Sequence, residues 1–126
     1  MAHIANRSRY APLTYVRQGR IMRHGIVESA EFVRQAESIF TQRELFSLQL
    51  ALMNNPTLGV VIPGTRGLRK VRWGAGSSGK RGGARVIYFW RSYSGEIQLL
   101  AAYEKRSRAN LSRVELLRLR ASIDTD

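Results

Sequence analysis

The period of the apolar residues changes near Gly59, and this change constrains the fold more than any other feature of the sequence. From Ser29 to Phe40 and from Thr41 to Met53 the apolar residues recur at helical spacing. After Gly59 they alternate with polar residues, as they do in strands. A chain with this order is predicted to form an α+β domain, in which the helices are segregated from the sheet along the sequence.

Local signals predict where the helices begin. Ser29 precedes the first helical stretch, and the segments Thr41–Glu44 and Ser112–Glu115 both match the capping-box pattern. In that pattern the hydroxyl and the carboxylate each accept a hydrogen bond from a free backbone N–H. The sequence Asn54-Asn55-Pro56 ends the second predicted helix.

Four segments have the composition of strands: Ile21–Val27, Leu68–Trp73, Ala84–Arg91 and Glu96–Tyr103. The last two are separated only by the turn-like residues 92–95, so an antiparallel hairpin is predicted there. We therefore expect an N-terminal strand and two helices, followed by a twisted antiparallel sheet and a C-terminal helix.

The chain of 126 residues fits one domain, preceded by a separate basic segment. Residues 1–22 contain no acidic residue and show weak periodicity, so we expect a mobile basic extension, with the domain at 23–126. An unstructured leader is favoured for this extension over an arm that grips RNA.

Charge is the strongest functional signal. The chain has 21 Lys and Arg against nine acidic residues, and a formal net charge of +12. No acidic residue occurs from Leu45 to Gly95. Such a field attracts polyanions, of which nucleic acid is the most common in cells. A membrane partner is not expected, because no basic amphipathic helix, long apolar run or signal peptide is evident. The lack of cysteine suits the cytoplasm, where we expect the protein to act.

Gly74–Lys80 matches the first seven positions of a phosphate-binding P-loop. Arg81 then stands where a Ser or Thr would hold magnesium, and a strand-like run follows in place of a helix. This segment is therefore predicted to be a long, mobile, basic loop, in which Lys80 and Arg81 can contact RNA phosphates.

Lys70 and Arg72 are two residues apart in a predicted strand, so both project from one face of the sheet. Adjacent cations repel each other, although a solvated face tolerates them. Arg85 in the next strand joins them if the register permits, and such a cluster suits an RNA phosphate. A second wall of the same basic cleft is predicted at Lys105, Arg106 and Arg108; a plain basic connection is the alternative. Neither His3 nor His24 has a metal-ligand spacing, so no metal and no cofactor are expected.

Three blocks of sequence resemble the HigB branch of the RelE-type toxins: Asn55-Pro56-x-x-Gly59, the segment Ile62–Trp73, and Gly79–Tyr88 with its Gly-Lys-Arg-Gly-Gly run. The resemblance runs from about His24 to Leu119. It implies a RelE-like fold and a toxin of a type II toxin–antitoxin system. Such a toxin is an endoribonuclease that cuts messenger RNA on the ribosome without a metal. It also implies a cognate antitoxin, which often carries a helix-turn-helix. The toxin would then contact DNA only indirectly, through this antitoxin.

The resemblance also implies roles for individual residues. Lys70, Arg72, Arg85 and Lys105 would be catalytic. From their charge and position in the sequence, the residues expected to bind RNA are Arg69, Lys80, Arg81, Arg106 and Arg108. Family members usually show Tyr-x-Lys-Asn-Glu where this chain has Tyr103-Glu104-Lys105-Arg106-Ser107, and Asn110 replaces a frequent acid. No tyrosine follows Tyr103, so no C-terminal catalytic tyrosine is assigned.

The implied reaction is attack of the RNA 2′-hydroxyl on the adjacent phosphorus, with Arg72 and Arg85 stabilising the charge that develops. Lys70, crowded by like charges, is a candidate for the proton transfer. Two other functions remain open: a non-catalytic RNA- or ribosome-binding module, and a degenerate toxin that folds but does not cleave.

Overall fold

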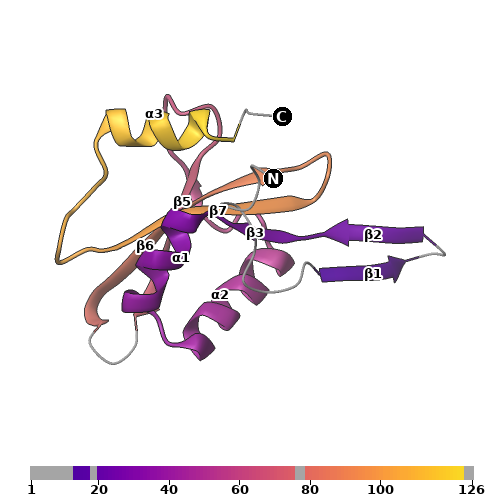
Figure 1. Ribbon diagram of the computed structural model, residues 1–126, viewed down its shortest axis with the longest axis horizontal. Helices are drawn as coiled ribbons and strands as arrows, with labels where there is room; N and C mark the ends of the chain where they lie inside the picture. Colours follow the sequence, from indigo (N-terminus) through magenta and orange to yellow (C-terminus); the bar gives the residue numbers. More distant parts are fainter. Residues whose placement is uncertain (1–12, 18–19, 76–78, 124–126) are drawn as a thin grey trace.

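The computed structural model describes residues 13–17, 20–75 and 79–123, and the side chains of 25–74 and 83–123. Over these residues the chain is α+β, with three helices and a five-stranded sheet (Figure 1). The elements are, in chain order, β1 (Leu13–Arg17), β2 (Arg20–His24), β3 (Ile26–Glu28), α1 (Ala30–Ile39), α2 (Gln42–Asn54), β4 (Val60–Val61), β5 (Arg69–Ala75), β6 (Gly79–Arg91), β7 (Glu96–Glu104) and α3 (Arg113–Ala121).

The predicted helix starts are confirmed. The Phe32 N–H donates to the Ser29 hydroxyl over 3.0 Å at the start of α1. At α2 the Glu44 N–H donates to the Thr41 hydroxyl (3.1 Å) and the Thr41 N–H donates to the Glu44 carboxylate (2.8 Å). Ser112 and Glu115 form the same reciprocal pair at α3. Each box satisfies backbone donors that a helix start otherwise leaves unpaired.

The sheet has the order β3-β7-β6-β5-β4. The strands that follow the two helices, β4 to β7, pair in antiparallel fashion as predicted. β3 pairs with β7 in parallel, so the sheet as a whole is mixed. Ser29, the residue directly after β3, fixes the direction of this strand. The Ser29 N–H donates to the Leu99 carbonyl of β7 (3.1 Å), and the Ser29 side chain caps the start of α1, which packs over β7.

The N-terminal strand differs from the prediction. The segment predicted as one strand, Ile21–Val27, is divided at Gly25 between β2 and β3. β2 pairs with β1 as an antiparallel hairpin that extends to one side in Figure 1. Part of the predicted basic extension therefore has strand structure, whereas residues 1–12, 18 and 19 lie outside the described residues.

The predicted long loop before β6 was wrong as well. β5 continues to Ala75 and β6 begins at Gly79, and these two residues are paired. The pairing register of β5 with β6 shifts between Trp73 and Ala75. Such an irregularity allows the two strands to stay paired through a glycine-rich segment that lacks the alternating apolar and polar residues of a regular strand. Residues 76–78 lie outside the described residues.

The sheet separates two apolar cores. α1 and α2 cover one face, and α3 lies on the other side (Figure 1). The first core contains Phe32, Leu48 and Leu52 from the helices with Val86, Tyr88 and Leu99 from the sheet. The second contains Leu68, Ile87, Ala101 and Tyr103 with Leu119 of α3. In the described part of the chain, no helix has the length and apolar run needed to cross a membrane.

Candidate nucleic-acid interface

Three predicted site residues lie on the face of the sheet that α3 partly covers. In β5, Val71 packs in the first core, so Lys70 and Arg72 on either side of it point to the other face. β6 places Arg85 directly opposite Arg72, and Ile87 opposite Lys70. The three cations therefore come from adjacent positions of two paired strands.

These three cations differ in their access to solvent. Arg72 is exposed, Lys70 is half-buried, and Arg85 is only 9% exposed. One Arg85 guanidinium nitrogen lies 3.5 Å from the carbonyl of Ala84. Arg72 is thus the group best able to contact a phosphate directly. Arg85 contributes its positive charge from a buried position, where charge acts more strongly than in water.

Tyr103 extends this row across a third strand, because β7 places it directly opposite Arg85. Burial raises the pKa of the Tyr103 phenol, and the charges of Arg85 and Arg108 lower it by a smaller amount. The hydroxyl therefore stays protonated at neutral pH and can donate a hydrogen bond. The sequence reasoning did not assign Tyr103 to the site, because its partner depends on a register shift within the hairpin.

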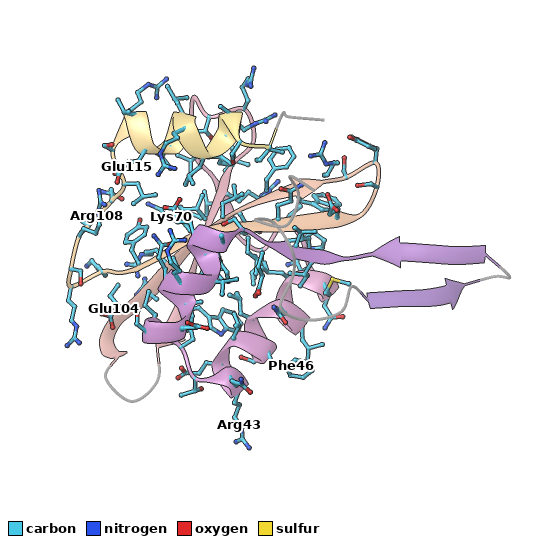
Figure 2. The ribbon with its side chains drawn as sticks, viewed as in Figure 1. Arg43, Phe46, Lys70, Glu104, Arg108 and Glu115 are labelled. Carbon is cyan, nitrogen blue, oxygen red and sulfur yellow. The ribbon has the colours of Figure 1, made fainter. Side chains whose placement is uncertain are left out.

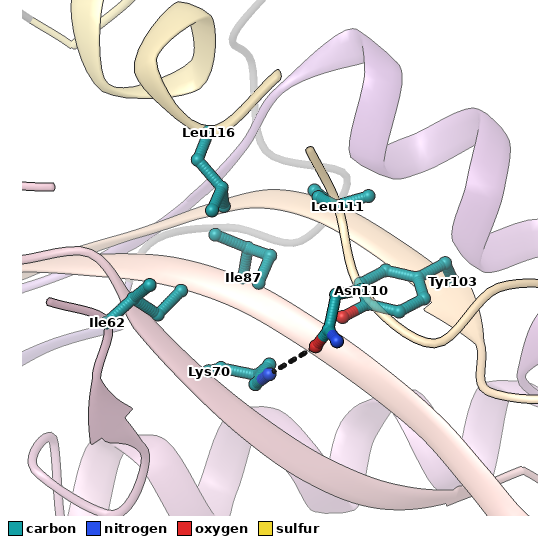
Figure 3. Close-up of a pocket in the computed structure, with 7 residues that line it drawn as sticks. All are labelled: Ile62, Lys70, Ile87, Tyr103, Asn110, Leu111 and Leu116. Atoms are coloured by element: carbon teal, nitrogen blue, oxygen red, sulfur yellow. Dashed lines mark hydrogen bonds between the residues drawn. The ribbon is translucent and has the colours of Figure 1, made fainter. Parts of the chain in front are cut away.

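A small pocket opens beside Lys70 (Figure 3). Its volume is about 190 Å³ and its walls are Ile62, Lys70, Ile87, Tyr103, Asn110, Leu111 and Leu116. The Lys70 ammonium donates to the Asn110 side-chain oxygen over 3.0 Å. In Figure 3, Asn110 lies between Lys70 and Tyr103. Asn110 was noted in the sequence only as a departure from the family pattern, and the structure gives it a contact within the site.

The predicted second wall lies in the segment after β7, near the start of α3 (Figure 2). Lys105 is exposed, and its backbone N–H donates to the Gly83 carbonyl over 3.2 Å. Arg108 donates two hydrogen bonds to the Glu115 carboxylate, over 2.6 and 3.0 Å. Arg106 lies 3.7 Å from a Glu104 oxygen. Two of these three cations are therefore partly neutralised by carboxylates.

Of the remaining predicted RNA-binding residues, Arg69 is described by the structure and is not brought to this cluster. Arg69 alternates with Lys70 and points to the opposite face, where its guanidinium donates to the Gly59 carbonyl over 2.7 Å. This bond holds the short strand β4 region beside β5, so the structure gives Arg69 a role in the fold. Lys80 and Arg81 belong to β6, and their side chains lie outside the described residues.

The described side chains contain no group of three or more His, Cys, Asp or Glu residues that could hold a metal ion. The side chains of His3 and His24 lie outside the described residues. No protein-family model matches the chain.

Proposed function

We propose that this protein is an endoribonuclease toxin of the RelE/HigB type, with a RelE-like fold, that cuts messenger RNA on the ribosome without a metal. The observation that carries the proposal is the row Arg72, Arg85 and Tyr103 across three paired strands, with Lys70 beside it. A concentration of cations favours an anionic ligand, and a neutral phenol next to it can donate a proton.

The chemistry needs groups of this kind. When the 2′-hydroxyl attacks the phosphorus, the 2′-oxygen–phosphorus bond forms and the bond to the 5′-oxygen breaks, giving a 2′,3′-cyclic phosphate and a free 5′-hydroxyl. Negative charge develops on the phosphoryl oxygens, and fixed guanidinium groups stabilise it. An arginine keeps its proton, so other groups must move the two protons. Lys70, in its neutral amine form, would accept the proton of the 2′-hydroxyl, and the Tyr103 phenol would donate a proton to the leaving 5′-oxygen.

The sequence blocks that resemble the family support its fold more directly than its activity. The Tyr88 hydroxyl donates to the Pro56 carbonyl (2.7 Å) and accepts from the Gly59 N–H (2.8 Å), which fixes the Asn55–Gly59 block against the sheet. In the next block, Gly64 and Gly67 have φ values of 76° and 104°, which other residues rarely adopt. The fold itself requires these residues, so they do not distinguish a toxin that cleaves RNA from one that does not.

The partners in this proposal are the ribosome with its messenger RNA and a cognate antitoxin. Exposed apolar side chains are candidates for contact with the antitoxin, among them Phe46 on α2, which is 54% exposed, and Val60 on β4, which is 73% exposed. DNA would be reached only through that partner. Coexpression with the product of the neighbouring gene, followed by co-purification, tests this part of the proposal.

The activity is tested with purified ribosomes programmed with a defined messenger RNA. The wild-type chain is expected to cleave phosphodiester bonds at codon-phased positions of the messenger RNA and to leave 5′-hydroxyl ends. Lys70→Ala and Arg72→Ala should each slow single-turnover cleavage by about 100-fold or more, since proton transfer and charge stabilisation contribute that much. The matched control is Arg43→Ala, which removes an exposed cation from α2, far from the site in Figure 2.

Two other functions are a non-catalytic RNA- or ribosome-binding module and a degenerate toxin that folds but does not cleave. The carboxylates that pair with Arg106 and Arg108 favour the degenerate toxin, because they leave less positive charge there for RNA. The same assay separates both from the endoribonuclease. Intact messenger RNA with salt-dependent ribosome binding would contradict cleavage and favour the module, as would mapped 5′ ends that do not change when the protein is induced in cells.

A further inference from the structure

We propose that the pocket between Lys70, Tyr103 and Asn110 binds one nucleobase of single-stranded RNA. This inference rests on the proposed function, since the cations beside the pocket must first hold the RNA backbone. It adds a site that reads the base to the cations that contact the phosphate.

The size and walls of the pocket suit one flat ring system. At about 190 Å³ it is smaller than sites for drug-sized ligands, which occupy roughly 300–1,000 Å³. Ile62, Ile87, Leu111 and Leu116 supply apolar surface for the faces of a base, and the Tyr103 ring adds an aromatic wall. Single-stranded RNA is commonly recognised through unstacked bases held in this way.

The polar groups of the pocket suit the edge of a base. Tyr103 as a residue is 7% exposed, and its hydroxyl has no hydrogen-bond partner among the residues that the structure describes. The hydroxyl is not fully removed from solvent, so it is accessible to a ligand. The Asn110 oxygen accepts from Lys70, and its amide NH₂ likewise has no partner in the described part of the chain. A hydroxyl that donates or accepts and an amide that donates match the alternating donors and acceptors of a nucleobase edge.

The pocket is continuous with the proposed phosphate site. Lys70 is two residues from Arg72 on one strand, a separation of roughly 7 Å. Tyr103, on the pocket wall, faces Arg85 across the strand pair. Because one ribose joins a base to its phosphate, a base in the pocket would bring its phosphate toward these arginines. An anion without a base would need only the cations and would leave the apolar walls unused.

The test measures binding of the full chain to two fluorescent hexaribonucleotides by anisotropy at low salt. One hexamer carries all its bases and the other is abasic with the same backbone. We expect the wild-type chain to bind the intact hexamer about tenfold more tightly, the size of effect that one stacked base gives. Leu116→Trp fills the pocket and should bring the ratio of the two affinities close to one, while affinity for the abasic hexamer stays unchanged.

Val114→Trp is the matched control, because it places the same ring on α3 at a position that is 77% exposed. It should retain the wild-type ratio. If Leu116→Trp does not fold, Asn110→Leu at an exposed position replaces it, and the ratio should fall at least threefold. An unchanged ratio in these pocket variants overturns the base site but leaves the proposed function standing. If neither hexamer binds, or if binding does not weaken as salt is raised, the phosphate contacts and the base site are overturned together.

Discussion

Gly59 shows how closely single residues are constrained beside the site. A Cβ atom there would lie 2.8 Å from the Tyr88 ring and 2.9 Å from the Lys70 carbonyl oxygen. The backbone carbonyl cannot move without disturbing the pairing of β4 with β5. Gly59→Ala is therefore expected to lower the free energy of unfolding by about 1–3 kcal/mol, as overpacking usually does. Urea denaturation measures this change.

Gly74→Ala is the control for this prediction, since an added Cβ at Gly74 meets no atom within 4 Å. Its effect should stay within about 0.5 kcal/mol of zero, as for an ordinary surface change. Equal midpoints and slopes for the two variants would show that the contact with Tyr88 relaxes freely.

Asn110 determines how much of the Lys70 charge is available. Its amide oxygen accepts a hydrogen bond from the ammonium group without neutralising it. Asn110→Asp would place a carboxylate there, which would pair with Lys70 and repel a phosphate, so RNA affinity at low salt should fall about tenfold. Fluorescence anisotropy measures this loss. Asn54→Asp adds the same charge at an exposed position at the end of α2, and equal losses in both variants would show that only net charge matters.

At the level of elements, the start of α3 depends on a charged cap. The hydrogen bonds from Arg108 and Ser112 lower the pKa of Glu115 from an ordinary 4.5 to about 2. A carboxylate with a depressed pKa stabilises the folded state fully above about pH 4.5, and this stabilisation is lost as pH falls through about 2. Glu115→Gln keeps a capping acceptor but removes the charge.

The wild type should therefore be more stable than Glu115→Gln at neutral pH, and the difference should shrink between about pH 4.5 and about pH 2. Urea midpoints across this range measure it. A difference that persists unchanged at pH 2 would mean that the charge of Glu115 does not stabilise α3.

Elements also show what could be predicted from the sequence. Helix starts were predictable because capping is local: Ser29, Thr41 and Ser112 act on backbone groups within three residues. The partner of Arg85 was not. Near the turn Arg91 pairs with Glu96, and continuing that register would place Ala102 opposite Arg85. A register shift between Ile87 and Tyr88 places Tyr103 there, and no turn residue signals it.

For the whole molecule, the α+β class could be predicted from the sequence, but the pairing of distant strands and the contacts between distant segments could not. The alternation in β5 correctly separated Lys70 and Arg72 from Val71, because one face of the strand had to be core. The parallel pairing of β3 with β7 joins segments about seventy residues apart, and such non-local contacts have no local sequence signal. The same holds for the contact between Lys70 and Asn110, two residues that line the pocket.

With a net charge of +12, any exposed cation on the protein is expected to attract RNA to some extent. A test of the proposed site must therefore separate binding at the sheet from attraction by the net charge of the protein. The salt dependence of binding does this, since the slope of log K against log salt counts the phosphates contacted, at about 0.7 per contact for single strands. Arg72→Gln should reduce the slope by about this amount, because Arg72 is the exposed cation of the row. Arg43→Gln removes the same charge from the surface of α2 and should leave the slope unchanged. Equal slopes for the two variants would mean that RNA follows the net charge of the protein and has no preferred position on the sheet.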